Sequence, residues 1–210
     1  MNATCAEPAE MRTREGRARL YGFLAGVFCS PPTEESRRAV FDMATVLDID
    51  RPRELAVGEL EREFMDLLVV PNPRYVAPYE SVYRDRWPIP PDLAGGPEPD
   101  GAPRTTTRLL MGESTLAVRQ CFREAGVEPM EDLPDHISNE LKLMSHLWSG
   151  EGQEPCGENG RLAGLRSKLR DDHLLRWVGE LQRKVSEHDR SGLYSTALRV
   201  VEVVLENDGN

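Results

Sequence analysis

The chain has 210 residues, of which 39% are hydrophobic and 30% are charged, and its formal net charge is −10. This length suits one domain with a complete hydrophobic core and leaves little room for two. The excess of acidic residues argues against a nucleic-acid partner, because a phosphate backbone is bound by clustered Lys and Arg side chains.

The first predicted element is a helix near the N-terminus, within the stretch RTREGRARLYGFLAGVF. Its apolar residues recur with the spacing of an amphipathic helix that faces a core. They are Leu20, Tyr21, Leu24, Val27 and Phe28. Nearby glutamates dilute the positive charge and the apolar run is short, so we do not expect a secretory leader here. No apolar run in the sequence approaches the length of a transmembrane helix, and no stable membrane insertion is expected.

Two further helices are predicted before residue 70. The first starts with Thr33 as its N-cap, because a hydroxyl followed by Glu34 and Glu35 satisfies free backbone N–H groups and suits the helix dipole. The residues expected to be buried in it are Ala39, Val40, Met43, Val46 and Leu47. The second runs from about Arg53 to Leu68. The residues expected to be buried in it are Leu60, Phe64, Leu67 and Leu68.

The middle of the chain is rich in proline. The stretch VVPNPRYVAPYESVYRDRW holds too many prolines to be helical throughout, and a Pro/Gly-rich loop follows at about residues 88–104. Helical periodicity returns over about Thr106–Ala125 and Leu133–Trp148, and a Gly-rich break at about residues 149–160 precedes two or three C-terminal helices. Because no alternating strand pattern of useful length is present, we predict an all-α, single-domain bundle of about seven to nine helices over residues 1–210.

The cysteines bear on the cellular compartment. The four of them lie far apart in the sequence and form no CxxC pair, which is typical of reduced thiols in a cytoplasmic protein. The same spacing argues against a structural zinc site. They are Cys5, Cys29, Cys121 and Cys156.

The stretch MEDLPDHISNELKLMSHLW holds the main candidate motif. Pro134 suits the first turn of a helix, where its missing N–H costs nothing, and the Asp135 carboxylate is placed to accept free N–H groups there. His136 and Glu140 are four residues apart, so both project from one helix face. The motif lies in the most acidic part of the chain, since residues 124–158 contain nine acidic residues and one lysine, a net charge of −8.

Three interpretations of this motif are open from the residues alone. The first is a capped helix with a His–Glu pair on its surface. The second is a metal site with His146 as a further ligand, although His146 lies about 15 Å from His136 by helical rise. The third is a docking site in which Asp135 supplies an anion and His136 a hydrogen-bonding group. The sequence contains no GxSxG, GK[ST] phosphate loop or GxGxxG that would indicate an enzyme of a known type.

Four stretches together resemble one family. EDLPDHISNELKLMSHL resembles the signature helix of the redox enzyme maturation chaperones, the TorD/DmsD family, to which NarJ is more distantly related. Three other blocks are similar to that family in order and spacing across nearly the whole chain. They are LYGFLAGVFCSPP, EFMDLLVVPNPRYVAPYESVYRD and LRDDHLLRWVGEL.

The resemblance implies a cytoplasmic, all-helical chaperone with no catalytic activity and no cofactor of its own. Its partners would be the twin-arginine signal peptide and the apo form of a molybdoenzyme catalytic subunit, which it would hold for cofactor insertion before export. It would act as a monomer or a homodimer. Carried over by position, the residues implied at the peptide site are Tyr21, Tyr79, Glu80, Ser81, Tyr83, Pro134, Asp135, His136 and Glu140.

The chemistry of these residues suits such a peptide. A guanidinium group is always charged and pairs best with carboxylates, which Glu80, Asp135 and Glu140 would supply. Aromatic side chains, with Trp87 added to the tyrosines, would provide stacking and an apolar floor. The acidic segment would speed the encounter with a basic leader.

Two alternatives stay open. One is a helical metal-dependent hydrolase that uses Asp135, His136 and Glu140, with His146 or His173 recruited in space. The other is an assembly scaffold that binds no leader peptide.

Overall fold

The structure is a computed structural model. It describes residues 8–49, 53, 55–88, 106–108, 110–129, 133–150 and 160–209, with only the backbone at residues 8–12, 86–88 and 106–108. This part of the chain folds into nine α-helices, two short π-helical segments and one pair of short strands.

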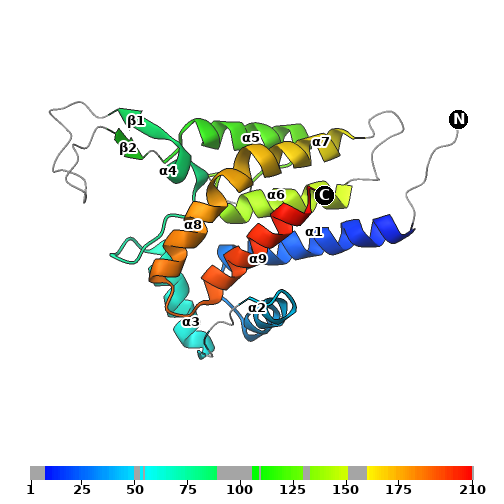
Figure 1. The fold of residues 1–210 in the computed structure, drawn as a ribbon. Coiled ribbons are helices and arrows are strands. Elements are labelled where there is room, and N and C mark those ends of the chain that lie inside the picture. The colour runs from blue at the N-terminus through cyan, green and yellow to red at the C-terminus, as the bar shows by residue number, and fades with distance from the viewer. Residues whose placement is uncertain are drawn as a thin grey trace, which may run out of the picture.

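The elements follow one another in a simple order (Figure 1). They are α1 (Pro8–Cys29), α2 (Glu34–Val46), α3 (Val57–Phe64), the π-helix η1 (Met65–Val69), α4 (Glu80–Arg84), β1 (Arg86–Pro88), β2 (Thr106–Arg108), α5 (Glu113–Ala125), α6 (Ile137–Gly150), α7 (Arg161–Lys168), the π-helix η2 (Leu169–Leu174), α8 (Leu175–His188) and α9 (Leu193–Asn207).

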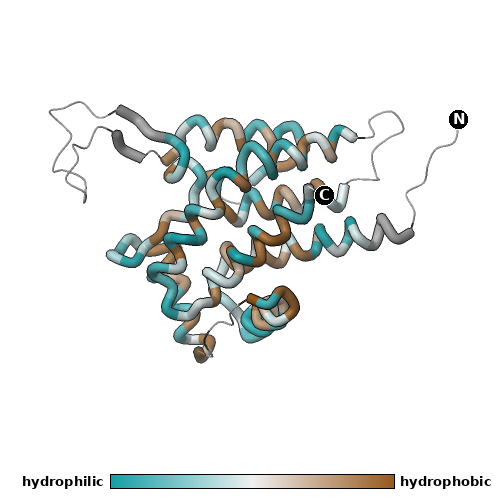
Figure 2. Tube along the Cα trace, in the orientation of Figure 1, coloured by the Kyte–Doolittle hydropathy of each residue, from teal (hydrophilic) through white to brown (hydrophobic). Residues whose placement is uncertain are grey.

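Helix α6 occupies the centre of the bundle. It packs along α1 over most of its length, and α7 and α5 cover its other side (Figure 1). Helix α9 packs on α8, α2 and α1. Hydrophobic residues recur along the helices and are densest along α9 (Figure 2), where both faces are covered. The buried hydrophobic side chains of the described residues form one cluster, and the predicted all-α bundle is confirmed.

The predicted N-cap of the second helix is confirmed. The Thr33 hydroxyl accepts the N–H of Ser36 at 3.1 Å, and the Ser36 hydroxyl accepts the N–H of Thr33 at 2.8 Å, so the two residues form a capping box. The burial predicted for Val46 is wrong, since this side chain is 83% exposed. Helix α2 packs mainly against α9, and its fully buried side chains are Val40 and Ala44.

The third helix begins later than predicted. It starts at Val57, because the backbone N–H of Arg53 donates to the carbonyl of Ser191 at 2.8 Å and is tied to the turn before α9. Its predicted inward side chains are confirmed, with a π-helical segment in place of its last turn. The buried residues are Leu60, Phe64, Leu67 and Leu68.

The helix predicted from Thr106 also begins later, at Glu113. Thr106–Arg108 instead pairs antiparallel with β1, and Trp87 lies opposite Thr107. This ribbon was not predicted, because three-residue strands are too short to show an alternating pattern. The Pro/Gly-rich loop predicted beyond Pro88 and most of the Gly-rich break lie outside the described residues. No helix in the described part of the chain is both long and apolar enough to span a membrane.

Candidate functional site

Two motifs that are far apart in the sequence meet in the structure. Tyr79 and His136 form an antiparallel β-bridge. The N–H of Ile137 donates to the carbonyl of Pro78, and the N–H of Glu80 donates to the carbonyl of Asp135, both at 2.9 Å. The stretches PYESVY and PDH, each singled out from the sequence, therefore form one backbone junction that leads into α4 and α6.

The Asp135 carboxylate caps a helix other than the one it precedes. It has no exposed surface, and its Oδ2 accepts the backbone N–H of Ser81 at 3.0 Å, in the first turn of α4. Helix α4 starts after Tyr79, which makes no side-chain cap of its own. The prediction that Asp135 caps the helix of its own motif is therefore wrong. Pro134 is buried in the turn that precedes α6, and Ser81 is buried too.

His136 is the residue that caps α6. Its Nδ1 accepts the N–H of Ser138 at 3.2 Å, and its carbonyl accepts the N–H of Glu140 at 3.1 Å. Its ring meets the Tyr79 ring edge to face, with centroids 5.0 Å apart. Burial lowers the pKa of His136 to about 4, although the Asp135 charge opposes that shift. At neutral pH the imidazole is uncharged, and Nδ1 is free of a proton to accept this bond.

Behind this junction lies a buried polar cluster. Glu80 has no exposed surface, and its Oε2 lies 2.9 Å from Nδ1 of His173 on η2. Arg84 also bonds the Glu80 carboxylate. Burial alone would lower the pKa of His173, but hydrogen bonds to Cys121 and Glu80 outweigh it and raise the pKa to about 9. Glu80 is therefore held by two cations at neutral pH.

Glu140 belongs to the same buried cluster. Its Oε2 accepts the indole N–H of Trp177 at 3.4 Å, and none of its surface is exposed. Burial raises the pKa of Glu140 well above its ordinary value, and the charge of Glu80 raises it further. The interpretation with a His–Glu pair on the helix surface is therefore wrong, and so is the expectation that both side chains project from one face, since Glu140 is buried in the core and His136 contacts Tyr79 and Ser138.

The remaining predicted residues lie in different surroundings. Tyr83 is buried against the Trp177 ring, and its hydroxyl donates to the carbonyl of Ala77 at 2.8 Å. Tyr21 is fully buried, and its hydroxyl donates to Oδ2 of Asp208 at 2.5 Å. The side chain of Trp87 lies outside the described residues.

The metal interpretation has no geometric support in the described residues. They contain no group of three or more His, Cys, Asp and Glu side chains placed to hold a metal ion. His146 is exposed, whereas Glu140 is buried on the same helix.

The Tyr79–His136 junction forms one wall of a surface pocket of about 340 Å³. The end of α1 and the π-helical segment η1 form the other walls, and most of the lining is apolar or aromatic. The lining residues are Phe28, Cys29, Pro31, Phe64, Met65, Leu68, Val69, Tyr75, Tyr79 and His136.

Sequence reasoning missed most of this pocket. Tyr79 and His136 were predicted as site residues, whereas Phe28, Phe64 and Leu68 were assigned only to the core. The available sign was the run MDLLVV, which is apolar beyond what one helix face can bury. Within that run Met65 is 40% exposed and Val69 is 45% exposed.

Comparisons with known proteins identify the family of the chain. A profile of the family described as nitrate reductase delta subunit matches residues 31–183. The chain is 25% identical over 192 residues to the chaperone protein TorD of Vibrio cholerae serotype O1, strain ATCC 39315, which covers 91% of this chain and 78% of that protein. It is 22% identical over 204 residues to the chaperone protein TorD of Escherichia coli O81, covering 95% of this chain and 85% of that protein.

The profile match covers most of the chain and includes α4, the Tyr79–His136 junction, α6 and most of α8. The similarity to TorD extends to nearly the full length, and the resemblance found in the sequence motifs is confirmed. The relatives are chaperones, not enzymes. The chain therefore belongs to the nitrate reductase delta subunit family, as a TorD/NarJ-type chaperone of molybdoenzyme maturation.

Proposed function

We propose that this chaperone acts in the cytoplasm by binding the twin-arginine signal peptide of a molybdenum-cofactor oxidoreductase. It would hold the apoenzyme for cofactor insertion before export. The observation that carries this proposal is the apolar pocket beside the Tyr79–His136 junction. A twin-arginine leader consists of two guanidinium groups followed by an apolar run, and the molecule offers a counterpart to each part.

The pocket is suited to the apolar run. Its volume of about 340 Å³ lies in the range of ligand-binding pockets, and aromatic and aliphatic side chains form most of its walls. His136 lies in the wall as a neutral imidazole, because burial lowers its pKa to about 4. A neutral ring neither repels an approaching arginine nor places a charge beside apolar side chains.

Carboxylates beside the pocket are suited to the guanidinium groups. Glu80, Asp135 and Glu140 are buried directly behind the junction, and Oδ1 of Asp135 and Oε1 of Glu140 have no hydrogen-bond partner, although the raised pKa of Glu140 favours its uncharged form in the free protein. A buried acceptor without a donor is costly, so a guanidinium that reached these atoms would gain strong, charge-assisted bonds. Since these carboxylates have no exposed surface, such contact requires a local rearrangement of the junction.

Calorimetry of the purified chain with a synthetic leader tests this function. The leader would come from the molybdoenzyme encoded nearest this gene, and a twin-lysine version would be the control. We expect micromolar or tighter binding of the twin-arginine leader and weaker binding of the twin-lysine one, because lysine cannot bond a carboxylate in a bidentate way.

Two exposed apolar residues provide a matched pair of variants for the pocket. Val69→Asp places a charge in the pocket wall, whereas Leu116→Asp places one on α5, where the side chain is 64% exposed and outside the pocket lining. We expect the first variant to weaken binding at least tenfold and the second to leave it unchanged. Absence of binding to both leaders would contradict the function, and equal loss in both variants would contradict the use of this pocket.

A further inference from the structure

Glu80 already binds a guanidinium group, and that group belongs to the same chain. Glu80 is the first residue of α4 and Arg84 is the last, so their side chains lie one turn apart on one face. Arg84 Nη1 bonds the Glu80 carboxylate and donates to the carbonyl of Asp172 at 2.6 Å. The Arg84 side chain is 34% exposed, whereas the side chains of Glu80 and His173 are 0% and 4% exposed. Arg84 is therefore the partner of Glu80 that reaches solvent.

The loss of this guanidinium would leave Glu80 with a partner. His173 Nδ1 stays 2.9 Å from Glu80 Oε2, and the raised pKa of His173 keeps it protonated at neutral pH. Arg84 would regain hydration, because its side chain is already 34% exposed, and the buried Glu80 charge would not be left without a counter-ion. Arg74, which also pairs with a buried glutamate, is not displaceable in the same way. Its side chain is only 17% exposed and bonds Glu63, Asp66 and the carbonyl of His188 at once.

We propose that Arg84 is an internal substitute for an arginine of the peptide, which displaces it from Glu80 when the leader binds. This inference rests on the proposed function and adds to it a named contact and an autoinhibitory residue. It also gives a reason for preferring arginine, because the site already holds a planar guanidinium in the free protein, and the arginine of the peptide would take the place that Arg84 leaves.

The location of Arg84 fits the pocket. Tyr79 lines the pocket and Glu80 is the next residue, and Arg84 lies about 6 Å further along the axis of α4 by helical rise. An extended peptide covers that length in about two residues. If the apolar run of the leader lies beside Tyr79, a residue just before that run would therefore be near enough to contact the Glu80 carboxylate.

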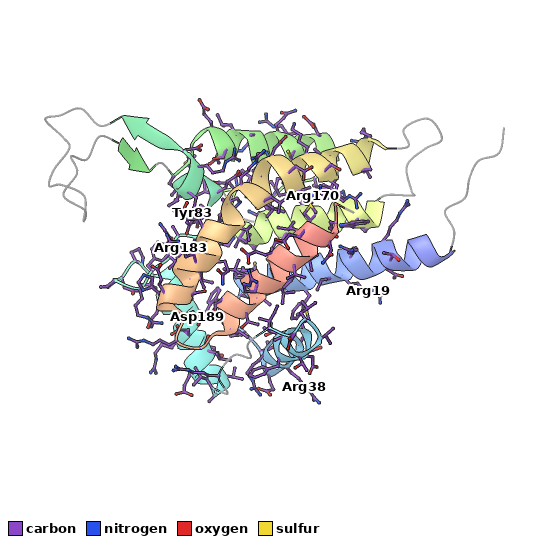
Figure 3. All side chains as sticks on the ribbon, viewed as in Figure 1. Arg19, Arg38, Tyr83, Arg170, Arg183 and Asp189 are labelled. Carbon is purple, nitrogen blue, oxygen red and sulfur yellow. The ribbon has the colours of Figure 1, made fainter. Side chains whose placement is uncertain are left out.

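Removal of the internal competitor should strengthen binding of the twin-arginine leader. We expect Arg84→Ala to lower the Kd about three- to tenfold, because the apparent Kd is the intrinsic Kd divided by the fraction of molecules in which the site is open, here about a third to a tenth. The gain should be smaller for the twin-lysine leader and should disappear in the double variant R84A/E80Q. Arg183→Ala is the matched control, since it removes the same charge from an exposed pair with Glu187 on α8 (Figure 3).

A second measurement needs no leader. With Glu80 freed of Arg84, millimolar methylguanidinium should raise the Tm of R84A but not that of the natural chain or of R84A/E80Q. Arg84→Met keeps an aliphatic side chain at this position and repeats both measurements if R84A loses helical content. Unchanged or weaker leader binding in both Arg84 variants, without a methylguanidinium effect, would overturn the inference. Binding of the leader by the natural chain would then still stand, whereas its absence in every variant would overturn the proposed function.

Discussion

His136 combines a structural role and a place in the pocket wall in one side chain. Its Nδ1 accepts a backbone N–H at the start of α6, and its ring packs against Tyr79. The capping role requires the uncharged imidazole, because protonation of Nδ1 would remove the acceptor. Burial accordingly lowers the pKa of His136 from its ordinary value near 6.5 to about 4.

This lowered pKa makes stability depend on pH in a defined window. Between about pH 6.5 and pH 4 the unfolded chain binds a proton at His136 that the folded chain does not, so stability falls as the pH falls through this range. We expect a contribution of at most about 3 kcal/mol to be lost, from the size of the pKa difference. Urea unfolding of the natural chain and of His136→Asn at a series of pH values measures it, because asparagine caps a helix without titrating.

Other groups titrate in the same range, so the difference between the two proteins is the quantity to compare. Glu140 acts in the opposite direction, since its raised pKa favours the folded state at low pH. His146→Asn, on the exposed side of the same helix, is the control, and its unfolding free energy should follow that of the natural chain at every pH. A parallel pH dependence of the natural chain and His136→Asn would show that the imidazole is not held neutral.

At the scale of elements, α4 and α5 share one feature. The N-terminus of each helix is capped by an aspartate that is not the residue directly before it. Asp135 caps α4, and Asp85, which follows α4, caps α5 by accepting the N–H of Ser114 at 3.0 Å and its hydroxyl at 2.5 Å. The residue before α5 is Gly112, which has no side chain to serve as a cap. These bonds fix α4 and α5 to each other and to the junction beside the pocket.

Gly112 leaves the space that Asp85 needs. A Cβ added at Gly112 would lie 2.0 Å from Oδ2 of Asp85, so Gly112→Ala must displace the carboxylate from its bonds to Ser114. We expect a loss of about 1–2 kcal/mol, the usual effect of losing a helix cap. Gly26→Ala is the matched control, because nothing lies within 4 Å of an added Cβ there and alanine favours the interior of α1 by up to about 1 kcal/mol.

Thermal unfolding of the two alanine variants checks this argument. We expect the Tm of Gly112→Ala to fall and that of Gly26→Ala to stay the same or rise. Equal Tm values would mean that Asp85 has another way to cap α5.

At the scale of the molecule, the helices, many of their inward faces and the start of α2 were predictable, whereas the starts of α3, α5 and α6 and the pocket were not. Helical periodicity is local, so the inward faces of α1, η1 and α6 followed from it. The starts of α3 and α6 depend on backbone N–H groups that donate to the carbonyls of Ser191 and Pro78, which are remote in the sequence. The pocket likewise depends on three segments that meet only in the fold. Family resemblance pointed to Tyr79 and His136, which line the pocket, but it could not show that Glu80 and Glu140 are buried.

Tyr21, predicted at the peptide site, instead belongs to a group of side chains that hold Asp208 after α9. Its hydroxyl donates to Asp208 at 2.5 Å, Trp148 donates to the same carboxylate at 3.2 Å, and Arg17 forms an ion pair with it. The guanidinium of Arg166 lies over the Trp148 ring at 3.6 Å. The Arg170 guanidinium lies close to Gly209, just beyond the end of α9 (Figure 3). The residues directly after α9 are thereby fixed to α1, α6 and η2.

The contacts of Tyr21, Trp148 and Arg17 with Asp208 should affect the stability of the fold but not the affinity for the leader. Asp208→Ala leaves the buried Tyr21 hydroxyl, the partly buried Trp148 indole and the Arg17 cation without their acceptor, so we expect a loss of about 3 kcal/mol. Tyr21→Phe removes one bond and costs about 1 kcal/mol. Glu206→Ala, an exposed acid on the same turn, should have no effect. Because neither Tyr21 nor Asp208 lines the pocket, leader affinity measured by calorimetry should be equal in all folded variants. A Tyr21→Phe protein that kept its stability and bound the leader more weakly would return Tyr21 to the binding site, where the family resemblance had placed it.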